Sequence, residues 1–286
     1  MVFNPRRAVC FLAVLILASK SLAVAQGTYT EIEVPGATYT YPLGIDDNGD
    51  VVGWYSGSSG SSGFLLSEGS YTTIQYPGSS TTVPYGINDN GQIVGYTDLG
   101  SGFLYKVQTR DFTEISYPGA AQTFPTSINN SGVIAGGISN GSETSGFELV
   151  GSQHRRIAPE GATTVYVWGI SASGEVVGTA GGYNFFTNFE CRAAACKQLL
   201  IPNLPNFTVA RINLAGTAVV GWYITSTGAD AGFLYAGGTL TTVEFPGAVS
   251  TYCFGVNNQG EVTGRFYDVN GNPHGFTWDP AGMKKQ

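Results

Sequence analysis

The sequence predicts an all-β fold, a six-bladed β-propeller with four antiparallel strands in each blade. The motif GINDNGQIVGY, from Gly86 to Tyr96, places two apolar-rich runs on either side of an Asn-Gly step. Asn-Gly is a strong hairpin signal, because the tightest hairpin turns need two residues that accept positive φ. Related motifs recur at intervals of 41 to 44 residues, and a period of this length with several strands per unit is typical of propeller blades. The first apolar residues of the copies are Ile45, Ile87, Ile128, Ile170, Ile212 and Val256.

The composition supports short strands joined by tight turns. The 286 residues include 41 Gly, 16 Phe and 16 Tyr, and only 12% of them are charged. Glycine favours turns and aromatic residues favour strands. A β-sandwich is the main alternative, but that fold does not require such a regular internal repeat.

The first 25 residues resemble a secretory signal peptide. Arg6 and Arg7 precede a short apolar run over residues 8–18, and Ala23-Val24-Ala25 matches the small-residue cleavage pattern, so we expect cleavage before Gln26. A membrane anchor would need roughly 20 apolar residues, and polar residues interrupt this run too early. A twin-arginine export signal is a further alternative. The protein is therefore expected to be secreted or periplasmic.

Cleavage would leave an acidic chain, with 10 Lys and Arg against 20 Asp and Glu, a formal charge of −10. Nucleic acids and anionic membranes bind basic surfaces, so neither is expected as a partner. We expect no membrane span after cleavage, and a monomer.

Each repeat supplies four strand candidates, which in the second repeat are residues 83–88, 92–97, 102–106 and 112–117. A proline follows the last of them and should end it, since proline cannot donate to a sheet. The predicted blades are 41–76, 83–117, 124–158, 165–201, 208–245 and 252–279.

The last repeat lacks a fourth strand, and the chain begins with a spare one. The segment YTEIEVPG from Tyr29 matches YTTIQYPG from Tyr71. We therefore predict that residues 28–34 complete the last blade and close the ring, which protects exposed sheet edges. Residues 26–280 would form a single propeller domain, and residues 281–286 a C-terminal tail.

Taken together, the hairpin motif, the step Gly102-Phe-Leu-Tyr105 and the segment from Tyr71 to Gly78 resemble the bacterial extracellular repeats called the HAF family. The His-Ala-Phe step that names the family is best preserved here as His274-Gly275-Phe276. The resemblance covers nearly the whole mature chain. It implies a secreted bacterial repeat protein, and it brings no established activity or catalytic residues.

Three cysteines remain after signal cleavage. Cys191 and Cys196 lie close in sequence, and export to an oxidising compartment favours a disulfide between them over a metal site. Cys253 is then expected to be a buried free thiol.

The candidate binding site is the face where the Pro-Gly connections and the variable second connections of the blades emerge, because rigid scaffolds present binding residues on loops. Arg211 stands where the other repeats have glycine or serine, near the ring axis. It would either hold an anionic or hydroxylated ligand in the channel, or pair with a carboxylate and plug it.

Aromatic residues are the other tentative ligand-binding residues. Tyr85, Trp168 and Phe254 each precede the axial position, and Tyr41 lies close to it. They could stack on sugar rings at the mouth of the channel or pack between blades. Trp54 and Trp222 each directly follow a Val-Val-Gly step. Both are expected in the core between blades.

No catalytic residues, cofactor or metal site are predicted. The segment from Asp46 to Asp50 lacks the glycine and glutamate positions of a calcium loop, and two histidines exclude a multi-histidine site. No nucleophile elbow, phosphate loop or dinucleotide motif is present. The first hypothesis is a non-enzymatic module that binds a protein or glycan at the loop face. The alternative is a propeller enzyme acting on glycans, a hydrolase or lyase.

Overall fold

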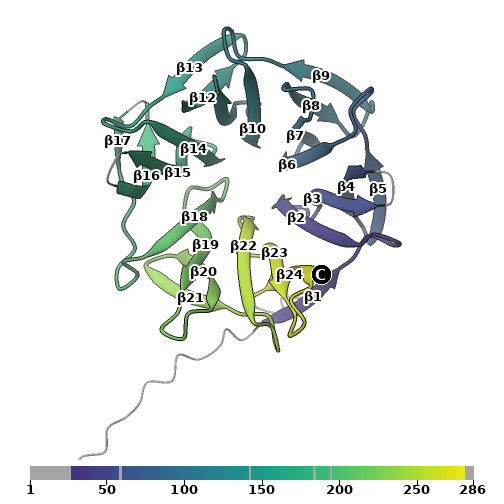
Figure 1. Cartoon of the computed structure of the whole chain (residues 1–286), viewed down its shortest axis with the longest axis vertical. Coiled ribbons are helices and arrows are strands. Elements are labelled where there is room, and N and C mark those ends of the chain that lie inside the picture. The colour runs from purple at the N-terminus through teal and green to yellow at the C-terminus, as the bar shows by residue number, and fades with distance from the viewer. Residues whose placement is uncertain (1–26, 58–59, 142, 183–184, 194, 281–286) are drawn as a thin grey trace, which may run out of the picture.

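The computed structural model describes residues 27–57, 60–141, 143–182, 185–193 and 195–280. They form six four-stranded antiparallel sheets arranged as the blades of a propeller (Figure 1), which confirms the predicted fold. None of these residues forms a helix, and so none forms one that is long and apolar enough to cross a membrane. The predicted signal peptide and C-terminal tail lie outside the described residues.

In blades 1 to 5 the strands run outward from the axis in chain order, and in blade 6 the outermost strand is β1. Blade 1 contains β2 (Tyr39–Ile45), β3 (Val51–Gly57), β4 (Gly60–Ser67) and β5 (Ser70–Ile74), and blade 2 contains β6 (Thr82–Asn88), β7 (Gln92–Thr97), β8 (Gly102–Lys106) and β9 (Asp111–Ile115). Blade 3 contains β10 (Gln122–Ile128), β11 (Ile134–Ser139), β12 (Thr144–Val150) and β13 (Gln153–Ile157), and blade 4 contains β14 (Thr164–Ile170), β15 (Glu175–Gly182), β16 (Phe185–Arg192) and β17 (Ala195–Gln198). Blade 5 contains β18 (Phe207–Ile212), β19 (Ala218–Ile224), β20 (Asp230–Ala236) and β21 (Thr239–Val243), and blade 6 contains β22 (Ser250–Val256), β23 (Val262–Tyr267), β24 (Pro273–Asp279) and β1 (Thr28–Ile32).

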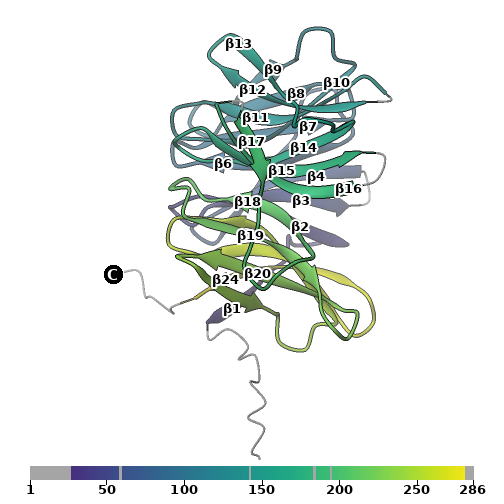
Figure 2. The same ribbon diagram turned by 90° about the vertical axis from the view of Figure 1, so that its left-hand side faces the viewer.

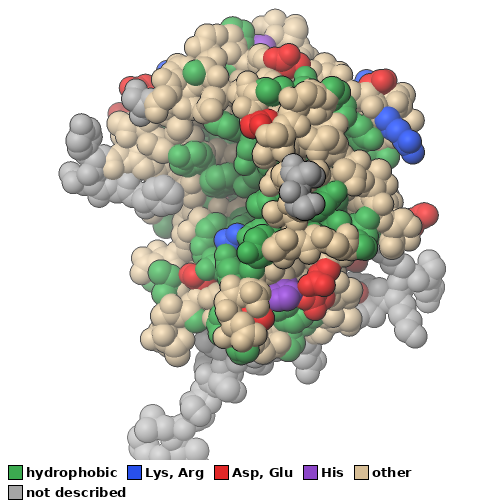
Figure 3. Space-filling view, turned by 45° about the vertical axis from the view of Figure 1, so that its right-hand side comes forward, with side chains coloured by type: hydrophobic (Ala, Val, Ile, Leu, Met, Phe, Trp, Pro, Cys, Tyr) green, Lys and Arg blue, Asp and Glu red, His purple; other side chains and the backbone are tan. Residues whose placement is uncertain are grey.

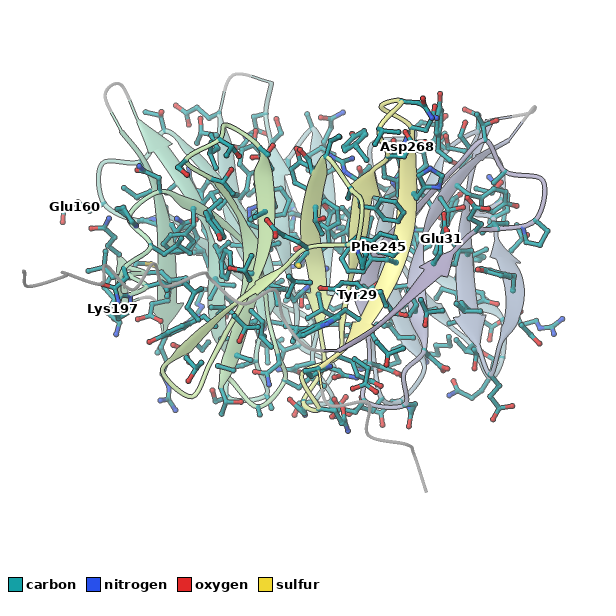
Figure 4. All side chains as sticks on the ribbon, turned by 90° about the horizontal axis from the view of Figure 1, so that it is seen from below. Tyr29, Glu31, Glu160, Lys197, Phe245 and Asp268 are labelled. Atoms are coloured by element: carbon teal, nitrogen blue, oxygen red, sulfur yellow. A yellow bond between two sulfur atoms is a disulfide. The ribbon has the colours of Figure 1, made fainter. Side chains whose placement is uncertain are left out.

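The first strand of the chain closes the ring. β1 pairs antiparallel with β24, from Thr28 opposite Asp279 to Ile32 opposite Gly275, which confirms the predicted closure. Figures 1 and 2 both show β1 beside β24 at the outer edge of blade 6. The ring of Tyr29 packs edge-on against Phe245, with centroids 5.6 Å apart (Figure 4).

The core lies between blades and is built from the repeated Gly-Phe step. Its phenylalanines are fully buried, and they are Phe64, Phe103, Phe147, Phe233 and Phe276. The glycine before each one leaves room for the next blade, since a Cβ on Gly63 would lie 2.5 Å from the ring of Pro84. The repeat therefore encodes the contact between blades as well as the strands.

The hairpin turns depart from the predicted geometry. In the turn between β6 and β7 of blade 2, only Gly91 has positive φ, at 65°, and its N–H donates to the carbonyl oxygen of Asn88. The loop has three residues between the paired Asn88 and Gln92, the arrangement of a type I turn followed by a glycine bulge rather than a two-residue turn. Asn88 Oδ1 accepts from the N–H groups of Asn90 and Gln92, and Nδ2 donates to the carbonyl oxygen of Asn129 in blade 3 at 2.9 Å. The repeated asparagine thus links neighbouring blades as well as closing the turn.

The cysteines lie as predicted. Cys191 and Cys196 face each other across β16 and β17 and are joined by a disulfide. Cys253 is a free thiol with no exposed surface, and burial raises its pKa.

Candidate functional site

Every innermost strand carries a β-bulge near the propeller axis. The pairing with the second strand shifts by one residue at the same repeat position in all blades. A bulged residue is left out of the ladder, so its carbonyl group is free to point elsewhere. The bulged residues are Leu43, Tyr85, Thr126, Trp168, Ala210 and Phe254.

The side chain of Arg211 gathers the carbonyl groups of the five other blades. Nη1 donates to Thr126 and Trp168, both at 2.7 Å; Nη2 donates to Tyr85 at 2.9 Å and Leu43 at 3.1 Å; and Nε donates to Phe254 at 3.4 Å. A guanidinium has five N–H donors, so these bonds use all of them. The sequence left two roles open for Arg211, binding a ligand or plugging the channel. These contacts support the second role, with backbone carbonyl groups as partners in place of the expected carboxylate.

The axis has room for only one such side chain. A Cβ on Gly44 would lie 2.9 Å from the carbonyl oxygen of Tyr85, and one on Gly86 would lie 2.8 Å from that of Thr126. This close approach of the strands explains why the other repeats have small residues there. Arg211 is 6% exposed, and burial lowers its pKa to about 10, which leaves the guanidinium charged at neutral pH.

The four aromatic residues singled out from the sequence lie around this hub in two groups. Tyr85 and Trp168, from blades 2 and 4, have nearly parallel rings with centroids 6.3 Å apart, and the Arg211 guanidinium lies 5.8 Å from the Tyr85 ring centroid. Tyr41 and Phe254, from blades 1 and 6, form the second group. Their rings lie around the guanidinium of Arg265. All four are partly exposed.

Trp54 and Trp222 were expected in the core between blades. Trp222 of blade 5 does pack against rings of blade 6, but neither tryptophan belongs to the buried core. Both are only half-buried. Trp54 stacks on Tyr41 at a centroid distance of 4.3 Å, and Trp222 packs edge-on against Phe254 at 5.8 Å. They contact the aromatic residues beside the axis and extend that group outward.

Arg265 was missed by the sequence analysis. It lies on β23 at the repeat position that holds Trp54, Tyr96 and Trp222 in three blades and Gly137 and Thr179 in two others, so a charged residue at this position was a weak signal. Its Cζ atom lies between 5.0 and 5.4 Å from the ring centroids of Tyr41, Tyr252, Phe254 and Tyr267. Arg265 Nε is buried without a hydrogen-bond partner, and no carboxylate of the described residues forms an ion pair with this side chain.

We call the side chains of Tyr41, Tyr85, Trp168, Phe254 and Arg265, which lie beside the propeller axis, the funnel. Figure 3 shows a hollow on this side of the molecule, with hydrophobic side chains on its walls and a basic side chain among them. Next to the funnel, the Tyr252 hydroxyl donates a hydrogen bond to the carboxylate of Asp230, and within the described part of the chain no hydrogen bond or ion pair joins a carboxylate to a funnel side chain. The arrangement offers flat apolar rings and a cation without a carboxylate partner.

No family model matches the sequence, and no curated protein matches it significantly. The fold is similar to solved propellers. A gluconolactonase from Xanthomonas campestris is 12% identical with a TM-score of 0.53, over 90% of this chain and 96% of that one. A luciferin-regenerating enzyme is 11% identical with a TM-score of 0.56, over 90% and 97%. TolB from Acinetobacter baumannii is 9% identical with a TM-score of 0.51, over 84% and 63%.

Identities this low support a shared fold and carry no activity from one protein to another. The resemblance to HAF repeats stays a prediction. What the comparisons and the sheet topology establish together is that this chain is a six-bladed β-propeller.

Proposed function

We propose that the protein is a secreted or periplasmic module that binds an acidic glycan in the funnel, without catalysing a reaction. The observation that carries the proposal is Arg265, a cation held among four aromatic rings with no carboxylate partner in the described chain.

The aromatic residues supply the apolar part of such a site. Tyr85 and Trp168 present nearly parallel rings, and Tyr166 stacks on Trp168 at 5.5 Å while remaining 38% exposed. Flat aromatic rings of this kind can stack on the apolar face of a sugar ring. Ligand sites commonly combine such aromatic walls with a few polar groups.

Arg265 supplies the charge. Its planar guanidinium can pair with a carboxylate through two parallel hydrogen bonds, which favours a uronic acid over a neutral sugar. The protein as a whole is acidic, and the hydrogen bonds of Arg211 are all used by carbonyl groups, so the Arg265 guanidinium would determine where the ligand's carboxylate binds.

An enzyme acting on glycans is the alternative, and it would need paired carboxylates about 5–10 Å apart. Among the described residues, the carboxylate nearest to the funnel in the hydrogen-bond network is that of Asp230, which is held by the Tyr252 hydroxyl beside the funnel. The site therefore favours binding over hydrolysis.

A glycan array probed with the purified mature chain tests the proposal. We expect signal on glycans that contain uronic acids, little signal on their neutral counterparts, and loss of signal for Arg265→Gln. The matched control Arg192→Gln removes an exposed arginine from blade 4 and should bind as the wild type does. Absence of glycan binding, or equal binding by the Arg265 variant, would contradict the proposal and favour a protein ligand.

A further inference from the structure

Blade 6 gathers a histidine and two glutamates across the seam that closes the ring. His274 Nδ1 lies 2.7 Å from Glu31 Oε1 and 3.1 Å from Glu33 Oε1, and the donor atoms of all three residues lie within 4.8 Å of one another. Glu31 and Glu33 belong to the N-terminal segment around β1, whereas His274 belongs to β24. The group therefore joins the two ends of the chain.

We propose that Glu31, Glu33 and His274 form a binding site for a zinc ion that fastens β1 to β24. One imidazole nitrogen and two carboxylate oxygens are a donor set that zinc accepts. Ligand atoms of a tetrahedral zinc site stand about 3.4 Å apart, as bond lengths near 2.1 Å require. The two distances from His274 Nδ1, 2.7 and 3.1 Å, are shorter than this, so both carboxylates would move outward by less than about 1 Å to admit the ion. Glu31 and Glu33 have side chains 44% and 63% exposed, so small movements would complete the geometry.

Asp268 provides an independent feature of such a site. Its Oδ2 lies 3.7 Å from His274 Nε2, the ring nitrogen that faces away from the glutamates. Histidines that bind metals commonly direct their second nitrogen to a carboxylate, which fixes the orientation of the ring. Asp268 is itself held by hydrogen bonds from the backbone N–H groups of Asn270 and Asn272, both at 2.8 Å. Figure 4 places Asp268 on the connection before β24 and Glu31 on the adjacent β1.

The repeats show that these residues are not part of the ordinary blade. The position of His274 is occupied by Ser62, Ser101, Ser145 and Ala231 in other blades. By register, the residues of blade 1 that correspond to Glu31 and Glu33 are Thr73 and Gln75. Ser62 Oγ there donates to Gln75 Oε1 at 2.8 Å, so a simple hydrogen bond satisfies the same positions. Within the described residues, only blade 6 combines a histidine with two carboxylates at these positions. Blade 6 is also the blade whose strands come from both ends of the chain.

The site has open space beside it. A depression of about 270 Å³ is lined by Glu33, Thr38, Tyr39 and His274, among others. Water molecules could complete the coordination of the ion there. Because the metal would bridge β24 to a strand that no short connection joins to it, binding should stabilise the closed ring.

Titration calorimetry of the metal-free mature chain with zinc chloride tests the site. We expect one zinc ion per chain, and an increase of about 5 °C in the midpoint of thermal unfolding when the site is saturated. Both effects should disappear for His274→Ser, which introduces the residue of blades 1 to 3, and for Glu33→Gln, which changes only an exposed side chain. His154→Ser, which removes the other histidine, is the matched control and should bind zinc as the wild type does.

A second readout locates the effect. Zinc should slow hydrogen exchange at the backbone amides of β1 in the wild type and leave exchange unchanged in Glu33→Gln. No zinc binding, equal binding by the His274 and Glu33 variants, or protection of a different blade would each overturn the proposal. Far-ultraviolet circular dichroism without metal verifies that the variants are folded, so that lost binding reports on the site.

Discussion

Arg211 and Leu43 are 168 residues apart in sequence, and Nη2 of the arginine donates to the carbonyl oxygen of the leucine at 3.1 Å. The same guanidinium reaches one carbonyl group in every other blade. The channel of this propeller is therefore closed by a cation of its own, held where the bulges release backbone acceptors. Each blade contributes one carbonyl group to a single shared centre, except blade 5, which contributes the arginine.

Replacing Arg211 by Ala should destabilise the protein by about 3–5 kcal/mol, because five buried carbonyl groups would lose their partner at once. Arg211→Lys should lose less, since an ammonium group offers three donors. Urea unfolding of the mature chain measures both, with Arg192→Ala as the exposed control. A loss under about 1 kcal/mol for Arg211→Ala, together with loss of ligand binding, would instead assign the arginine to the ligand.

Asp46→Asn should stabilise the protein at pH 7. Asp46 is 2% exposed, and burial raises its pKa from 3.8 to about 6, so its ionisation disfavours the folded state. Other repeats carry asparagine at this position, as at Asn88 and Asn129, and an amide keeps the acceptor that the N–H groups of Asn48 and Asp50 use.

The pH dependence of this substitution has a definite sign. The stability of the wild type should fall as the pH rises from about 4 to about 6, because the folded state then holds the proton more tightly than the unfolded state. Asp46→Asn should therefore gain about 2–3 kcal/mol at pH 7 and almost nothing at pH 4. Urea midpoints at the two pH values measure the gain. An equal gain at both would show that the buried charge is not its cause.

The blades and their closure could be predicted from the sequence because repetition makes weak signals add. One strand candidate is ambiguous, but the same spacing in every repeat fixes the order of strands, and the spare segment from Tyr29 then has one place to go. Arg211 was identified for the same reason, as a departure from a pattern of small residues. Its partners could not be predicted, since the bulges that free the carbonyl groups leave no mark on residue type.

Other features depend on three-dimensional register to within one residue. Glu33 and His274 are 241 residues apart and meet only because β1 pairs with β24 in one particular alignment. Arg265 is the only charged residue at its position of the second strands among the described residues, but its value as a site residue depends on rings from two blades. Sequence patterns describe each blade well and the contacts between blades less well.

Removing the disulfide should have a moderate effect. Cys191→Ala combined with Cys196→Ala should lower the free energy of unfolding by roughly 2 kcal/mol, the value for a short closed loop. The change should be confined to β16 and β17, which the disulfide joins directly. Hydrogen exchange of the wild type and the double variant measures where protection is lost. Loss of protection throughout the ring would show a wider role for the disulfide.

Trp168→Ala should weaken glycan binding about tenfold, because it removes a ring placed for stacking. The Trp168 ring is held by a hydrogen bond from Nε1 to Thr179 Oγ1 at 3.1 Å and by its contact with Tyr166. Trp168→Phe should retain most of the affinity, since it keeps a flat ring. Leu200→Ala, which truncates a 69% exposed apolar side chain, is the control. Titration with a uronic acid trimer measures the affinities, and unchanged binding by Trp168→Ala would remove this residue from the site.

The most direct test of the binding proposal is calorimetric titration of the mature chain and of Arg265→Gln with a galacturonic acid trimer and with its neutral galactose counterpart. We predict that the wild type prefers the acidic trimer, and that the variant loses about 10- to 100-fold in affinity for it while treating the two trimers alike. Equal affinity of the wild type for both trimers, or a variant that keeps the preference, would contradict the proposed role of Arg265.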